Sequence, residues 1–292
     1  LSCYEQVGWL TNEDNMEDSE FLKRIDELVP REKRMWPILW GNIRELPPRE
    51  MQNTKEEVWY VGIGSMMNLT NYLARFQLDS HKRIMLMAHW DTREFADKEL
   101  DDKNKKLPIL GANDGASGVA VLLTLAEIIH LLPTINIGID LLFIDGEDQG
   151  RAGDSENFGL GAQAFAKNIP YPLPEFAICL DMVADKEQEF LIEHFSLKQA
   201  PELVKTIWNL ANNLGYTQFQ NRLGYAVMDD HYYLYKYANI PAIDIIDFDY
   251  PNSEINYWHT LKDIPENCSA KSLGAVGTVM TQFIYRQDIM SP

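Results

Sequence analysis

The decapeptide LLFIDGEDQG, residues 141–150, places three carboxylates directly after an apolar run. The run at 141–144 predicts a buried strand, and Asp145, Glu147 and Asp148 follow it within four residues. Like charges this close repel one another and raise their own pKa values. A core strand that ends in acids needs a counter-charge, and a bound cation supplies one. We therefore expect a metal among these acids, with at least one acid left for proton transfer.

Residues of the same chemical kind follow other apolar runs of the chain. His89 and Asp91 come after RIMLMA, Asp181 comes after FAICL, and His259 lies in YWHT beyond PAIDIIDF. Asp114 lies in the loop ILGANDGASG, just before a long apolar segment. Ligands of open α/β sheets bind beyond the carboxyl ends of the strands, so these side chains should share one edge. Carboxylates and imidazoles suit zinc, and three protein ligands with an open position mark a catalytic zinc site.

Each of these residues also has a purely structural interpretation. Asp114 could be the N-cap of the following helix, and Asp181 could be a turn acid. His259 could be a surface histidine, and the pair Glu147–Asp148 could be solvated loop charge.

The elements that must position these residues alternate along the chain. Apolar or β-rich runs at 71–78, 83–90, 135–145, 176–182 and 241–248 predict strands, and the segments 115–132, 160–168, 200–215 and 269–287 predict helices. This alternation predicts an α/β fold: a single domain with a central, mostly parallel twisted sheet and helices on both faces. We expect residues 51–292 to form the catalytic domain. Residues 1–50 would be an N-terminal extension packed on it, with a helix at 19–29.

Composition excludes several classes of function. The 292 residues carry 44 acids against 26 bases, a net charge of −18, and no Lys/Arg cluster, so nucleic-acid binding is not expected. No apolar run approaches the ~20 residues that cross a bilayer.

Cys179 is expected to be a plain buried thiol. The opening Leu-Ser-Cys resembles the end of a bacterial lipoprotein signal, which implies a lipid anchor at Cys3 and a periplasmic or outer-membrane-anchored protein; a chance boundary is the alternative.

Six motifs occur in an order that is familiar: AHWDTR, GANDGASG, FIDGED, CLDMV, DDH and YWHT. The set resembles the zinc aminopeptidase-like superfamily, which also contains the glutaminyl cyclases, over roughly residues 68 to 285. Two features resemble the motifs of the cyclases rather than those of the peptidases: the Trp directly before His259 and the DDH at 229–231. AHWDTR and GANDGASG are similar to the bacterial cyclases.

The resemblance implies a zinc ligand set of Asp114, Asp148 and His259. The cyclases of animals and most peptidases have Glu where Asp148 stands, so the shorter side chain must move the metal or the loop. The resemblance further implies that Glu147 is the catalytic acid/base, that Asp181 and Asp229 belong to the hydrogen-bond network of the active site, and that Trp258 lines the substrate pocket.

The activity implied is that of a glutaminyl-peptide cyclotransferase, an acyltransferase that converts the N-terminal glutamine of peptides or proteins to pyroglutamate and releases ammonia. The nucleophile is the substrate's own amine, so one zinc ion would suffice, and His89 would be a supporting histidine oriented by Asp91. The alternative is a dinuclear zinc aminopeptidase, in which His89 and Asp181 hold a second metal and Asp114 bridges the two. A catalytically inactive binding protein is a third interpretation, but such a protein would be expected to have lost ligands.

Overall fold

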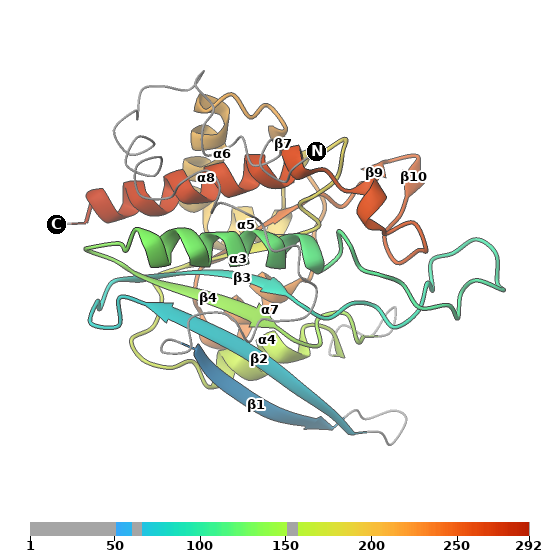
Figure 1. Cartoon of the computed structure of the whole chain (residues 1–292), viewed down its shortest axis with the longest axis horizontal. Coiled ribbons are helices and arrows are strands. Elements are labelled where there is room, and N and C mark those ends of the chain that lie inside the picture. The colour runs from blue at the N-terminus through green and yellow to red at the C-terminus, as the bar shows by residue number, and fades with distance from the viewer. Residues whose placement is uncertain (1–50, 60–65, 151–156, 292) are drawn as a thin grey trace.

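The computed structural model describes residues 51–59, 66–150 and 157–291, and these form an α/β fold around a six-stranded sheet (Figure 1). The strand order is β1-β2-β4-β3-β5-β8, with parallel pairing along β4-β3-β5-β8 and antiparallel pairing at β1-β2 and β2-β4. The predicted mostly parallel sheet is thus confirmed. Its strands are β1 Met51–Trp59, β2 Met66–Phe76, β3 Arg83–His89, β4 Gly138–Ile144, β5 Ala177–Asp181 and β8 Ala242–Ile246.

Helices cover both faces of the sheet, as predicted. One face packs against α3 (Ala116–Leu131), α6 (Pro201–Asn213) and α8 (Ala270–Ile289), and the other against α4 (Leu160–Lys167) and α7 (Asp230–Ala238) (Figure 1). The sequence of β3 explains why both faces are apolar. Ile84, Leu86 and Ala88 point into the first layer and Met85 and Met87 into the second, following the two-residue period of a strand.

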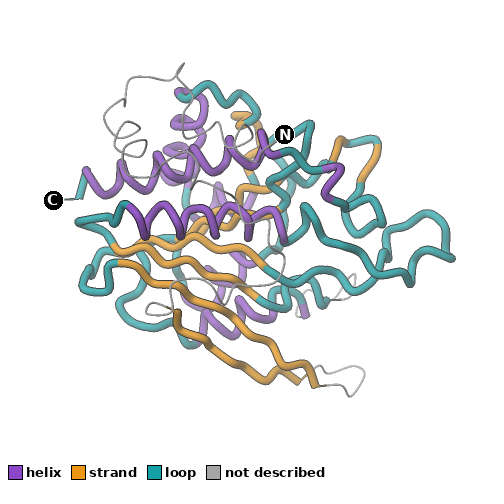
Figure 2. Tube along the Cα trace, in the orientation of Figure 1, coloured by secondary structure: helices purple, strands orange, loops and turns teal. Residues whose placement is uncertain are grey.

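Several elements lie outside the sequence-based prediction. They are the edge strand β1, the parallel pair β6 (Phe190–Ile192) and β7 (Phe219–Leu223), helix α5 (His194–Gln199), the pair β9 (Pro251–Asn252) and β10 (Ile255–Asn256), and the 3₁₀ turn η6 (Pro265–Asn267). The β1 sequence, MQNTKEEVW, is polar over most of its nine residues, and the other elements span only two to six residues, so none contains an apolar run of four or more residues. The loop after β3 and the β9–β10 pair lie beyond the carboxyl end of the parallel strands, where Figure 2 shows loops gathered.

The predicted N-terminal extension, its helix at 19–29 and the lipid anchor at Cys3 fall outside the described residues, so they stay predictions. None of the described helices is long and apolar enough to cross a membrane.

Candidate active site

Two histidines and three carboxylates converge where β3, β4 and β5 end. His259 Nε2 lies 2.9 Å from Asp148 Oδ1 and 3.3 Å from Asp114 Oδ2. On the other side of the same aspartate, His89 Nε2 lies 3.2 Å from Asp114 Oδ1 and 3.1 Å from Asp181 Oδ1. Each oxygen of Asp114 therefore faces one histidine. The fold brings together the five residues that the sequence analysis selected as metal-type ligands.

The three predicted zinc ligands each have a buried polar atom without a hydrogen-bond partner in the described part of the chain. Asp114 Oδ2, Asp148 Oδ2 and His259 Nε2 are buried, and none makes a hydrogen bond within the described part of the chain, in spite of the short distances. Buried polar atoms are nearly always satisfied, so unpaired ones need an explanation. Atoms from one imidazole and two carboxylates that converge without hydrogen bonds fit a cation held between them. His89, Asp114 and Asp148 also offer ligand atoms within 4.8 Å of one another.

The structural interpretations of these residues fail. Helix α3 has Gly115 at its N-cap with no side-chain cap, so Asp114 is not a capping residue. Asp148 and His259 are buried, which excludes solvated loop charge at Asp148 and a surface histidine at position 259. Asp181 is the last residue of strand β5 and is not a turn residue. His259 has a φ of 56°, a conformation that a residue with a side chain rarely adopts and that is enriched at functional sites.

Asp91 and Asp263 hold the ligand-bearing loops in place. Neither residue was expected to have this role from the sequence. The Asp91 carboxylate accepts hydrogen bonds from Glu147 N at 3.1 Å and Asp148 N at 3.2 Å. Asp263 accepts from Asn113 N at 2.7 Å and Asp114 N at 3.1 Å. The proposed orientation of His89 by Asp91 is looser, since His89 Nδ1 lies 3.6 Å from Asp91 and makes no hydrogen bond to described residues. Asp91 thus acts mainly on the backbone of the acidic loop.

Asp145, the first acid of the opening motif, turns away from the metal cluster. Gly146, with φ of 72°, lets the chain reverse direction between Asp145 and Glu147. The Asp145 carboxylate accepts Thr70 N at 2.8 Å, and burial raises its pKa to about 6. Asp145 therefore ties β4 to β2 and contributes no ligand.

Glu147 is the half-buried acid of the cluster. Burial raises its pKa well above the ordinary value, and the negative charges of Asp148 and Asp229 raise it further. A cation among Asp114, Asp148 and His259 would act in the opposite direction. A carboxyl group whose pKa is moved toward neutrality is suited to accept and return a proton.

The two carboxylates predicted to form the active-site network, Asp181 and Asp229, come from different elements. Burial raises the pKa of Asp181, at the end of β5, to about 7, although His89 opposes this shift. Asp229 is the N-cap of α7, and its side chain accepts a hydrogen bond from Asp230 N. Cys179 Sγ donates to Asp229 Oδ2 at 3.3 Å. The buried thiol is thus a partner of the network as well as a core residue.

Trp258 forms an aromatic wall directly against a predicted ligand. Its ring stacks on the His259 imidazole with centroids 3.9 Å apart and an interplanar angle of 27°. The Trp258 side chain is half-buried, and Phe248 contacts it with a centroid separation of 5.2 Å. Trp258 thus lies directly beside the predicted ligand set, and its role in lining a substrate pocket stays a prediction.

The fold and the site together define a class: an α/β protein with a carboxylate–imidazole site at the carboxyl edge of its parallel strands. The chain belongs to peptidase family M28, whose model matches residues 71–284. A search of curated proteins found no match.

Solved structures similar to this chain carry two kinds of activity in their names. The glutaminyl cyclase of Porphyromonas gingivalis is 30% identical with a TM-score of 0.80, covering 98% of this chain and 97% of that one. The glutaminyl cyclase of Bacteroides thetaiotaomicron, bound to N-acetylhistamine, is 31% identical with a TM-score of 0.78 and covers 97% and 96%. A Zn-dependent exopeptidase of Parabacteroides distasonis is 32% identical with a TM-score of 0.76 and covers 97% of each chain.

Proposed function

We propose that this protein is a zinc-dependent glutaminyl-peptide cyclotransferase. The single observation that carries the proposal is the stacking of Trp258 on His259, which lies between buried Asp148 and Asp114. This arrangement puts a flat apolar wall beside the predicted metal, as a compact glutamine side chain requires. The similarity to several bacterial glutaminyl cyclases supports the same activity.

The reaction joins two groups of one substrate residue. The α-amine of the N-terminal glutamine attacks the γ-carboxamide carbon, a C–N bond closes the five-membered lactam, and the C–N bond to the departing ammonia breaks. Zinc bound by Asp114, Asp148 and His259 would supply Lewis acidity toward the γ-carbonyl oxygen. Orientation of an intramolecular pair can itself contribute several kcal/mol, so the pocket wall at Trp258 has a catalytic effect through positioning.

Glu147 is the proton carrier in this proposal. Its carboxylate takes the proton that the attacking amine loses and returns it to the leaving nitrogen, so that neutral ammonia departs. Its elevated pKa favours uptake of the proton from the amine, and a bound cation would lower the pKa toward the working pH, which favours return of the proton. Asp181 and Asp229 would share protons and hydrogen bonds with the substrate amine and with Glu147.

A dinuclear zinc aminopeptidase is the second candidate, and one observation favours it. Asp114 directs one oxygen to each histidine, and Asp181 completes the set on the His89 side. We propose a single zinc nevertheless, because His89 Nε2 is already hydrogen-bonded to Asp181 and cyclisation needs no metal-activated water. We also propose a periplasmic or outer-membrane-anchored location with a lipid anchor at Cys3, which rests mainly on Leu-Ser-Cys and on the resemblance to the bacterial cyclases.

One incubation separates the two activities. The purified protein is given Gln-Ala-Ala and Ala-Ala-Ala, and both ammonia and free amino acids are measured. A cyclase releases ammonia from the first peptide only and lowers its mass by one ammonia. Free alanine or glutamine without ammonia would instead identify an aminopeptidase.

A further inference from the structure

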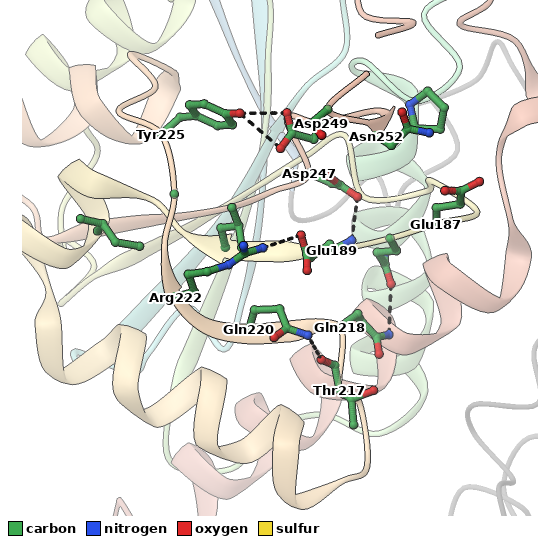
Figure 3. Close-up of a pocket in the computed structure, with 16 residues that line it drawn as sticks. Glu187, Glu189, Thr217, Gln218, Gln220, Arg222, Tyr225, Asp247, Asp249 and Asn252 are labelled. Atoms are coloured by element: carbon green, nitrogen blue, oxygen red, sulfur yellow. Dashed lines mark hydrogen bonds and ion pairs between the residues drawn. The ribbon is translucent and has the colours of Figure 1, made fainter. Parts of the chain in front are cut away.

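A polar cavity of about 750 Å³ lies outside the metal cluster. Three loop-rich segments line it, at 187–191, 217–225 and 247–253 (Figure 3). A smaller hollow, which also reaches Val227 and Phe248, shares Glu189, Tyr225 and Asp249 with it. Pockets of a few hundred to a thousand Å³ are of the size that binds a side chain or small ligand.

A row of aromatic rings connects this cavity to the candidate active site. Trp258 stacks on His259, Phe248 contacts Trp258 at 5.2 Å, and Tyr225 contacts Phe248 at 5.8 Å between centroids. The Tyr225 hydroxyl then donates to Asp249 Oδ1 at 3.1 Å, on the wall of the cavity (Figure 3). These steps put Tyr225 within about 11 Å of Trp258, the reach of about three extended residues. A peptide whose first residue lies at Trp258 can therefore follow the rings into the cavity.

The charge of the lining selects the kind of side chain that would enter. The ionisable acids and bases of the lining are Glu187, Glu189, Asp247, Asp249 and Arg222, and Arg222 is paired with Glu189 at 2.9 Å. Glu187 and Asp249 remain without a cationic partner among the ion pairs of the described residues. Burial raises the pKa of Asp247 to about 8, so a cation beside this carboxyl would favour its ionised form.

These acids are not arranged as a metal site. The groups of closely spaced ligand atoms in the described residues include none of the four carboxylates of the lining. Carboxylates that are spread over the lining, and not clustered, suit the charged end of a long side chain better than a bound metal ion.

We propose that the cavity binds a lysine or arginine side chain located two or three residues after the N-terminal glutamine of the peptide substrate. The inference rests on the proposed cyclotransferase function and adds a preference that the metal cluster itself does not determine. The aliphatic part of the side chain would pass along Phe248 and Tyr225, and its charged end would lie near Asp249 and Glu187.

A peptide scan tests the position and the charge. Pentapeptides with glutamine first and alanine elsewhere receive arginine, lysine or glutamate at position 2, 3 or 4, and the dipeptide Gln-Ala serves as a substrate too short to reach the cavity. We expect arginine or lysine at position 3 or 4 to lower KM about three- to tenfold relative to alanine, the range that one or two partly exposed charge pairs supply. Glutamate there should raise KM, kcat should stay constant, and added salt should shrink the differences.

Three variants make the test specific to this cavity. The double variant Glu187→Gln with Asp249→Asn should lose the preference for basic residues. Arg222→Gln, which removes the opposing charge from a well-exposed position, should increase it. The double variant Glu175→Gln with Glu202→Gln removes two exposed negative charges outside the lining and should keep the preference of the unmodified protein.

Equal KM values for arginine, alanine and glutamate peptides, with Gln-Ala cyclised normally, would overturn the cavity proposal and leave the proposed function intact. A preference that survives in the double variant would also overturn it. If Gln-Ala and every longer peptide stay uncyclised, the proposed function fails and this inference fails with it.

Discussion

Replacement of Glu193 by glutamine should destabilise the protein strongly, although this residue touches no ligand of the predicted metal. The buried carboxylate is a convergence point of hydrogen bonds. Its oxygens accept Phe195 N at 2.8 Å, Ser196 N at 2.6 Å and Val227 N at 3.0 Å, and His231 Nε2 lies at 3.1 Å. Glu193 thus joins the start of α5, the segment before DDH and the first turn of α7.

The magnitude follows from the pKa of this carboxyl. Burial alone would raise it, but the contact with His231 and the backbone donors lower the pKa from its ordinary 4.5 to about 2. A depression of that size corresponds to about 3 kcal/mol of folding stability. Since the folded-state pKa is the lower one, this stability is present above about pH 4.5 and is lost as the pH falls toward 2. Glu193→Gln is neutral at every pH and should lose about 3 kcal/mol at pH 7.

Urea unfolding of both proteins at pH 7, 5, 4 and 3 measures the effect. The difference in free energy of unfolding should be about 3 kcal/mol at pH 7 and should shrink steadily below pH 4.5. The exposed control Glu175→Gln should change stability by less than about 0.5 kcal/mol. A difference below about 1 kcal/mol at pH 7, or one that does not depend on pH, would refute the reasoning. The folded fraction of the variant should also have a lower kcat, because Asp229 follows directly after the segment that Glu193 holds.

The remaining predictions concern the site itself. Glu147→Gln should keep fold and metal but lower kcat at least ~100-fold, and near-normal ammonia release would remove Glu147 from the mechanism. His259→Ala should lose zinc in metal analysis after dialysis; full zinc content would disprove its assignment as a ligand. Trp258→Ala should keep zinc and raise KM for Gln-peptides by an amount worth about 1–3 kcal/mol, whereas an unchanged KM would make Trp258 a packing residue. Elemental analysis of the unmodified protein should give one zinc per chain, and two would support the aminopeptidase.

The gathering of the candidate site residues at one edge of the sheet is predictable from the amino-acid sequence. Asp148 follows an apolar run and Asp114 precedes an apolar helix, and the parallel sheet brings such positions to one edge for topological reasons, whereas His259 lies in a loop well beyond β8 and was assigned from the YWHT motif. The central strands are predictable because they are continuous apolar runs, and the long helices because their helical period is visible in the sequence. The carboxyl edge therefore gathers Asp114, Asp148, Asp181, His89 and His259, as the sequence indicated.

Only the tertiary structure decided how individual polar atoms are used. Asp145, Glu147 and Asp148 look alike in sequence, yet Gly146 directs Asp145 to Thr70 while the other two stay at the site. Asp263 reaches the backbone of Asp114 across 149 positions of the chain. Such contacts have no local signal, because the direction of a side chain depends on which distant segment packs beside it. The acidic cavity, built from three segments far apart in sequence, exists for the same reason only in the folded protein.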